Sequence, residues 1–351
     1  MTDLHLLSAM GISAQFDPGC GMIRDLAIQD EGRTITPMHR APWAGAPMPP
    51  DTPPHLTRLE GDFFCAPFSD GGGQNDMLHG WPANGRWTLE TRNEMALSAL
   101  LPHSVQGARV EKHLHLCDGH PFLYQRHVLR GGSGTLSVAN HAMVSLPDGG
   151  RLSFSPKSAF RTPDTAPEPD PARGRSRLAY PASSTEARDF PAADGDRVDL
   201  TRYPFGPAHE DFVIAIEAPG NRLGWTAVVR VGHGAVFLSL RDADVLPMTM
   251  LWHSNGGRDY APWSGRHRGC LGVEEGNAPH ILGQSGGLQL TGAGTLDIRH
   301  ITGAIAWPTD APVTTVMSQG DSLHIEGADG TVRDVPCALS HLFDTPAIPA
   351  P

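Results

Sequence analysis

The chain of 351 residues has five cysteines, no basic run and no long apolar run. The cysteines are far apart and include no C-x-x-C pair, which argues against both a disulfide framework and a zinc knuckle. Residues 1–15 lack the basic start and apolar stretch of a signal peptide. No segment has the length of a membrane span. We therefore expect a cytoplasmic, reduced protein with no membrane partner; a periplasmic location would require a removed leader.

Positive charge is scarce as well. The chain has 27 Lys and Arg against 38 Asp and Glu, a formal net charge of −11. A polyanion such as DNA would be repelled, so nucleic acid is not an expected partner. The sequence also contains no P-loop and no dinucleotide fingerprint. We expect no redox or nucleotide cofactor.

One group of histidines could suggest a metal site. His113, His115 and His120 lie close together in the sequence, and the first two share one face of an expected strand. A zinc site needs three or four ligands in a defined geometry. We expect these histidines to form a solvated polar face, and we expect no metal.

Glycine and proline, by contrast, are abundant, with 40 and 32 residues. Both are poor in helix interiors and common in turns. Short apolar or alternating segments recur between these turns, without helical crossovers, which indicates an antiparallel sandwich or barrel. We expect a single domain over residues 1–351, with a long loop at about 162–196 and a tail from about 340. The expected strands are residues 22–29, 86–90, 95–101, 108–116, 123–129, 134–144, 212–217, 224–231, 235–241, 248–253, 288–290, 295–305, 322–325 and 331–335.

Three short clusters carry candidate functional residues at strand ends or turns, where such side chains are commonly displayed. The first is Arg58–Phe68, followed by His79-Gly80-Trp81 and Arg86-Trp87. The second runs from Asn140 to Pro147, and the third from Cys270 to Glu275. Taken singly, each fits an ordinary turn or a satisfied core group. The segment from Trp252 to Trp263 is either a glycine-rich loop with incidental aromatics or, as we prefer, a wall of a binding cleft.

The order of these clusters resembles that of the aldose 1-epimerase (galactose mutarotase-like) family. The resemblance covers residues from about 20 to about 305 and rests on short motifs. The family has Leu-Glu-Pro where this chain has Val273-Glu274-Glu275, so the carboxylate is Glu274 or Glu275, and we prefer Glu274. The similar positions are Gly21–Leu26, Arg58, His79-Gly80, Arg86-Trp87, Asn140-His141, His209–Val213 and Val273–Glu275.

The resemblance implies an all-β, antiparallel supersandwich that interconverts the α and β anomers of a hexose or modified hexose. Ring opening needs a base at the C1 hydroxyl and an acid at the ring oxygen, roles that a carboxylate and a histidine can fill. Glu274 would be the base and His141 the acid, while His79 and Arg58 would bind sugar hydroxyls. Trp81 would stack on the sugar or belong to the core. Further expected substrate contacts are Asn140, Trp252 and one of His209, Glu210 and Asp211, for which we take Asp211.

Other functions remain open at this point. A carbohydrate-binding protein without catalysis would keep the aromatic residues but lack a competent Glu–His pair. An epimerase for a phosphorylated or sulfonated sugar would need extra Arg or Lys at the cleft. A glycoside lyase or hydrolase would need a second carboxylate at suitable separation. We expect a small-molecule sugar as the substrate, and a monomer or homodimer.

Overall fold

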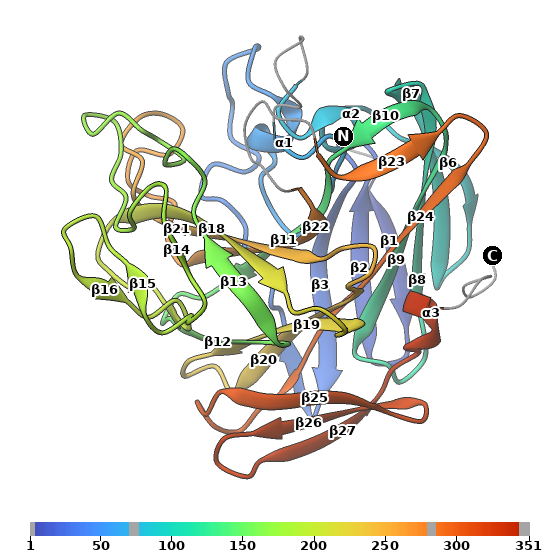
Figure 1. The fold of residues 1–351 in the computed structure, drawn as a ribbon. Helices are drawn as coiled ribbons and strands as arrows, with labels where there is room; N and C mark the ends of the chain where they lie inside the picture. Colours follow the sequence, from blue (N-terminus) through green and yellow to red (C-terminus); the bar gives the residue numbers. More distant parts are fainter. Residues whose placement is uncertain (1–3, 70–76, 279–285, 344–351) are drawn as a thin grey trace.

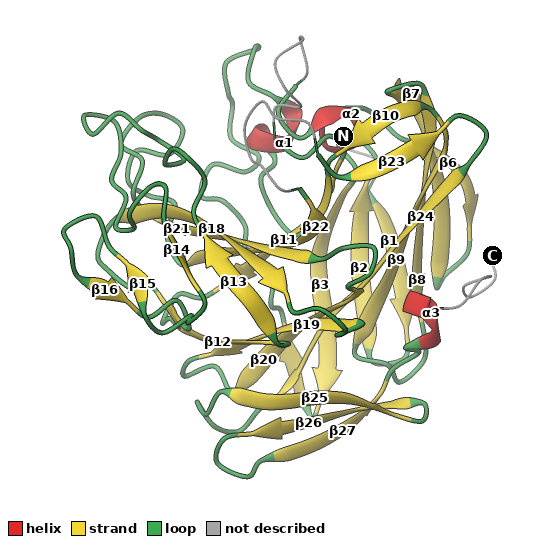
Figure 2. Ribbon diagram, viewed as in Figure 1, coloured by secondary structure: helices red, strands yellow, loops and turns green. Residues whose placement is uncertain are grey.

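Residues 4–69, 77–278 and 286–343 are described by the computed structural model, in which nearly all regular structure is antiparallel strand (Figures 1 and 2). Two large sheets pack against each other, and smaller sheets flank them. The expected all-β, antiparallel supersandwich is confirmed. Within the described ranges, no helix is long and apolar enough to cross a membrane.

The larger sheet has nine strands among the described residues. Its order is β17-β12-β19-β20-β24-β9-β8-β7-β6, so its centre combines strands from the middle and the end of the chain. The bounds are β6 Thr88–Arg92, β7 Ala96–Val105, β8 Ala108–Leu116, β9 Phe122–Gly131, β12 Gly150–Phe154, β17 Arg202–Tyr203, β19 Leu223–Arg230, β20 Ala235–Asp242 and β24 Thr295–Ala306.

The second sheet has seven described strands in the order β14-β13-β18-β21-β22-β11-β5. Its four central strands carry the residues of the candidate site described below. The bounds are β5 Phe64–Cys65, β11 Val138–Ser145, β13 Lys157–Arg161, β14 Ser183–Ser184, β18 His209–Glu217, β21 Met248–Asn255 and β22 Cys270–Asn277.

The remaining elements are small. Three described helices, each of four or five residues, lie outside the sheets: α1 Pro54–Thr57, α2 Gly80–Asn84 and α3 Ser340–Phe343. The other strands form one four-stranded, one three-stranded and two two-stranded sheets in the described ranges. Their bounds are β1 His5–Ala9, β2 Ile12–Asp17, β3 Met22–Asp30, β4 Arg33–Ile35, β10 Ser133–Leu136, β15 Phe190–Pro191, β16 Arg197–Val198, β23 Leu288–Thr291, β25 Val313–Gln319, β26 Ser322–Gly327 and β27 Val332–Pro336.

Strand β8 shows how the alternation of the sequence becomes a buried face. Val110, Leu114 and Leu116 are buried, as their period of two predicts. Lys112 lies on the same buried face, where its ammonium donates a hydrogen bond to the carbonyl oxygen of Gly21 at 2.7 Å. Burial lowers the pKa of Lys112 to about 8.

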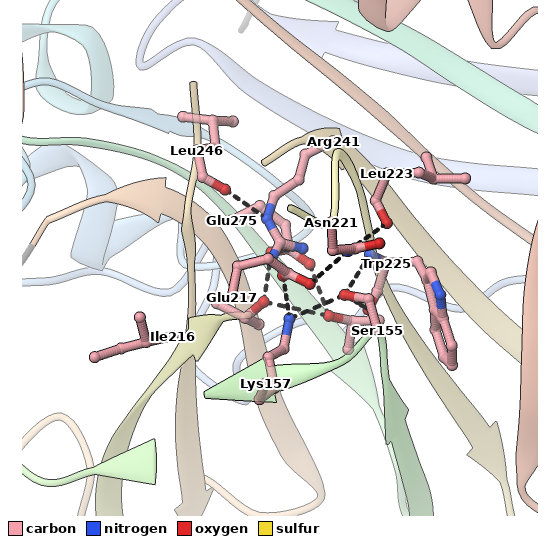
Figure 3. Close-up of polar contacts among 12 residues, drawn as sticks. Ser155, Lys157, Ile216, Glu217, Asn221, Leu223, Trp225, Arg241, Leu246 and Glu275 are labelled. Atoms are coloured by element: carbon pink, nitrogen blue, oxygen red, sulfur yellow. Dashed lines mark hydrogen bonds and ion pairs between the residues drawn. The ribbon is translucent and has the colours of Figure 1, made fainter. Parts of the chain in front are cut away.

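The space between the two large sheets holds a charged network as well as an apolar core (Figure 3). Arg241 of β20 reaches the seven-stranded sheet, where its guanidinium lies 2.7 Å from Glu275 and 2.5 Å from Glu217. Lys157 lies 2.5 Å from the same Glu217 carboxylate. Glu275 also accepts hydrogen bonds from hydroxyl groups of both sheets, those of Thr226, Ser239 and Thr249.

This network predicts that Arg241→Ala will strongly destabilise the fold. Removing one partner leaves a charge buried and uncompensated, which typically costs about 3–5 kcal/mol. Arg109 is a matched control because its ion pair with Glu90 is exposed, and such pairs contribute about 0–1 kcal/mol. Urea unfolding of both variants measures the difference. Equal, small losses would mean that the interior network is not stabilising.

Candidate active site

A cavity of about 380 Å³ lies on the face of the seven-stranded sheet that points away from the interior network. Four adjacent strands form its floor, because Phe212 pairs with Trp252 across β18 and β21, and His141 pairs with Glu274 across β11 and β22. The walls come from α1, the turn before α2 and the loop after β21. The lining residues are His55, Leu56, Leu59, Phe68, Ser69, Leu78, His79, His141, Pro167, Phe212, Trp252, Arg258, Tyr260, Ala261, Pro262, Trp263 and Glu274.

His141 and Glu274 meet on the floor of this cavity. His141 Nε2 lies 3.1 Å from Glu274 Oε1, and both side chains are buried. The contact lacks the alignment of a hydrogen bond, so both carboxylate oxygens of Glu274 have no hydrogen-bond partner among the described residues. The ring of Phe63 stacks on His141 with centroids 4.4 Å apart, which fixes the imidazole plane. The Glu274 carboxylate is therefore part of the cavity lining without a competing hydrogen bond from any described residue.

The pleat of β22 separates the two candidate carboxylates. Successive side chains of a strand point to opposite faces, so Glu274 faces the cavity and Glu275 faces the interior network. Gly272 makes room for the first of them, because a Cβ at this position would lie 2.5 Å from Glu274 Oε1. Any side chain at Gly272 would thus displace the Glu274 carboxylate.

Burial favours the neutral forms of the pair. It raises the pKa of Glu274 well above its ordinary value and lowers the pKa of His141 to about 3. A neutral imidazole beside a protonated carboxyl group holds one transferable proton between two sites. The pair can therefore give a proton to one ligand atom and accept a proton from another.

His79 enters the cavity from the turn before α2. His79 and Gly80 both have positive φ angles, and a Cβ on Gly80 would lie 2.1 Å from the carbonyl oxygen of Ala66. The Ser69 N–H donates to His79 Nδ1 at 3.4 Å, which leaves the proton of a neutral ring on Nε2. Burial lowers the pKa of His79 well below its ordinary value, so the ring is neutral. His79 can thus donate one hydrogen bond into the cavity.

Glu210 supports the opposite wall from beneath. Trp252 Nε1 donates to Glu210 Oε1 at 2.5 Å, and the Arg258 guanidinium lies 3.3 Å from the same oxygen. Arg258 also lies over the ring of Trp263, 4.5 Å from its centroid. These contacts hold two aromatic faces and one cation at the cavity surface, a combination suited to the C–H face and the hydroxyl groups of a sugar.

No protein-family model and no curated protein matches the sequence. Among solved structures, a candidate aldose 1-epimerase from Escherichia coli K12 superposes with a TM-score of 0.58 at 13% identity, covering 87% of this chain and 100% of that one. A galactose mutarotase-like protein from Lactobacillus casei gives 0.58 at 10% identity, covering 86% and 99%.

A galactose mutarotase related enzyme from Lactobacillus acidophilus gives a TM-score of 0.53 at 12% identity, covering 88% of this chain and 98% of that one. The matches span nearly the whole of these proteins. The chain has the galactose mutarotase-like fold. At 10–13% identity the likeness establishes the fold alone, so the chemistry must be argued from the cavity.

Within this galactose mutarotase-like fold, His79, His141, Trp252 and Glu274 come together as the sequence predicts. The other four predicted side chains lie outside the described lining of the cavity. The Arg58 guanidinium is 2.9 Å from both carboxylate oxygens of Asp17, and Trp81 stacks on His103 at the surface with centroids 3.7 Å apart.

Asn140 and Asp211 point to the far face of their strands. Asn140 is opposite Glu275 in the strand register and is fully buried. Asp211 accepts hydrogen bonds from the backbone of Arg177 and Leu178 and from the Tyr180 hydroxyl, and so fastens the long segment after β13 to β18. Of the three candidates His209, Glu210 and Asp211, it is Glu210 that supports the cavity wall.

Arg258 and His55 are lining residues with side chains able to bind a ligand that were not predicted as site residues. Arg258 lies inside the aromatic segment from Trp252 to Trp263 that we interpreted as a wall, but that segment offered no sign of which residue binds. His55 gave no sequence signal, because its neighbours are prolines and a leucine. It hydrogen-bonds the Asn84 side chain at 2.8 Å, and its ring lies 5.1 Å from that of His79.

The histidines 113, 115 and 120 are half-buried on the outside of the nine-stranded sheet. His113 lies 3.6 Å from Glu111, and His120 hydrogen-bonds the Tyr124 hydroxyl at 2.6 Å. Within the described ranges, their ligand atoms do not converge with those of any third metal-binding residue.

These positions predict different roles for two arginines. Arg258→Ala should weaken sugar binding at least tenfold, because a charge-assisted hydrogen bond contributes about 1.5–3 kcal/mol. Arg58→Ala should leave sugar affinity unchanged and lower the melting temperature, because buried Asp17 loses its main partner. Calorimetric titration with a panel of free sugars and thermal unfolding of both variants measure the two effects. A loss of affinity in Arg58→Ala would restore it as a binding residue.

Proposed function

We propose that this protein is an aldose 1-epimerase-type isomerase that interconverts the anomers of a hexose or modified hexose. The observation that carries the proposal is the buried His141–Glu274 pair, 3.1 Å apart on the floor of a cavity with an aromatic wall. Ring opening moves a proton off the C1 hydroxyl and another onto the ring oxygen. Rotation about the C1–C2 bond and reclosure with the roles reversed give the other anomer.

The pair needs one proton shared between its two members for this cycle. The sequence assigns the base role to Glu274 and the acid role to His141. Burial favours the neutral pair, in which His141 accepts the hydroxyl proton while protonated Glu274 donates to the ring oxygen. Both assignments use the same two groups and the same number of protons. Because ring closure reverses the transfers, each residue acts once as acid and once as base.

Other lining residues would orient the sugar. His79 donates its Nε2 proton to a ring hydroxyl, and Arg258 binds a second oxygen from the opposite wall. Trp252 and Trp263 offer aromatic faces to the C–H side of the ring. These contacts hold the anomeric carbon beside the proton-transferring pair, and such positioning contributes to catalysis by itself.

The alternatives fit the cavity less well. Glu274 is the only carboxylate in its described lining, whereas a glycoside hydrolase usually needs two. Arg258 is the only Arg or Lys in that lining, and it is already paired with Glu210, which disfavours a phosphorylated or sulfonated sugar. A binding protein without catalysis would have no use for a buried Glu–His pair, and burying it costs free energy.

Substitutions in the pair test the mechanism. Glu274→Gln and His141→Asn keep similar shapes but remove proton transfer, so each should lower anomer exchange by about 10²–10⁴-fold while sugar still binds. Since the two act in one proton circuit, the double variant should be little worse than either single one. Exchange is measured by NMR, above the spontaneous rate, with a panel of free, phosphorylated and acidic sugars.

Glu275→Gln is the matched control, because it changes the adjacent carboxylate on the opposite face of the strand. It should lower stability through the Arg241 ion pair and leave the activity of the folded protein near that of the unsubstituted chain. If Glu275→Gln abolishes exchange and Glu274→Gln does not, the wrong carboxylate has been assigned. If neither matters to a measurable activity, the catalytic proposal fails.

The pH profile tests the electrostatics of the pair. Because burial lowers the pKa of His141 from 6.5 to about 3, activity should persist as the pH falls through 6.5 for as long as the protein stays folded. On the alkaline side, kcat/KM should fall as the pH rises through the raised pKa of Glu274, where the pair loses its shared proton. Circular dichroism at each pH separates unfolding from titration. Loss of activity centred near 6.5 would show that His141 titrates like an exposed histidine.

A further inference from the structure

We propose that His39, His267 and Cys270 form a zinc site beside the sugar cavity. One ligand atom from each of these buried residues lies within 4.8 Å of the other two. They come from three separate segments: the connection after β4, the loop after β21 and the start of β22. The sequence shows no metal motif because the fold, and not the spacing along the chain, brings them together.

Two of the three side chains have a buried nitrogen without a partner. His39 Nε2 and His267 Nε2 make no hydrogen bond to any described residue. A buried polar atom left unsatisfied typically costs about 1–3 kcal/mol. A bound cation would satisfy both nitrogens at once.

A chain of hydrogen bonds fixes which nitrogen of His267 can bind a metal. Ser254 donates its hydroxyl proton to Glu210 at 2.9 Å, so its oxygen must accept from His267 Nδ1 at 2.7 Å. The proton of the neutral ring is therefore on Nδ1, and Nε2 carries a lone pair directed away from Ser254. Metal-binding histidines are typically oriented by a bond of this kind from their other nitrogen.

The donor set selects the metal. Two imidazoles and one thiol suit Zn²⁺ and not Mg²⁺ or Ca²⁺, which prefer oxygen ligands. Coordination releases the Cys270 thiol proton to solvent and leaves a thiolate on the metal. With zinc bonds of about 2.0–2.3 Å, ligand atoms lie roughly 3.5 Å apart, so the side chains close by about 1 Å on binding. Three protein ligands leave the fourth position to a water.

A second cavity gives an ion access to the proposed site, and two neighbouring tryptophans connect the site to the aromatic wall. His39 lines a second cavity of about 320 Å³ together with Arg24, Arg40 and Glu60, which gives an ion a path from that side. His267 stacks on Trp252, with centroids 5.4 Å apart, and meets Trp263 edge to face at 5.1 Å. A metal between His267 and Cys270 would therefore tie the loop that carries the aromatic wall to the sheet.

The test uses full-length protein without an affinity tag, stripped with EDTA and then incubated with Zn²⁺ alone. After desalting, elemental analysis should find about one zinc per chain, as expected for tight structural binding. Co²⁺ in place of Zn²⁺ should give the near-ultraviolet absorption of a thiolate–cobalt bond. An unsubstituted protein that retains no zinc and shows no such band overturns the proposal.

Variants identify the ligands. Cys270→Ser should abolish the cobalt–thiolate band, and His39→Gln should lower zinc retention at least tenfold. The matched controls are Cys65→Ser, which changes an equally buried thiol, and His127→Gln, whose ring nitrogens are also buried and unpartnered among described residues. Both controls should keep the metal. Full zinc retention by folded His39→Gln and Cys270→Ser would place any bound metal elsewhere and refute this site. If a variant does not fold, the zinc and cobalt results of the unsubstituted protein decide.

Discussion

The ion pair between Arg241 and Glu275 joins the two large sheets across their shared interior, and the stability of their packing depends on it. Glu275 is held by this arginine and by three hydroxyl groups, so the register and the pleat of β22 are fixed from the inside. The residue before it must then point outward, into the cavity. A one-residue slip of β22 would bury Glu274 in the charged interior and remove it from His141.

Much of the fold could be predicted because strand periodicity is a local property. The bounds of β8 are those expected, and thirteen further expected segments fall on strands of the structure. Residues 134–144 were expected as one strand but divide into β10 and β11, because β10 pairs with β23 whereas β11 pairs with β22 and β5. The strands β12 and β13 were not expected, because their partners β19 and β18 lie far away in the chain, where no local pattern reveals them.

The candidate site likewise contains some residues that a local motif identifies and others that depend on distant parts of the chain. His141 and Glu274 could be found because each belongs to a short motif on a central strand, where neighbours are fixed by backbone pairing. The ion pair of Arg58 could not be foreseen, because its partner Asp17 lies 41 residues away in sequence. The histidine–cysteine cluster could not be predicted for a similar reason. Only the fold brings His39 next to His267 and Cys270.

The hydrogen bonds of Asp211 affect the entropy that would be lost when a ligand binds. By accepting hydrogen bonds from Arg177, Leu178 and Tyr180, it fastens the long proline-rich segment whose Pro167 forms part of the cavity rim. That segment looks in the sequence like a flexible excursion, yet its backbone is anchored beneath the sheet. A rim that is ordered before the ligand arrives loses little conformational entropy on binding, so more of the contact energy remains as affinity.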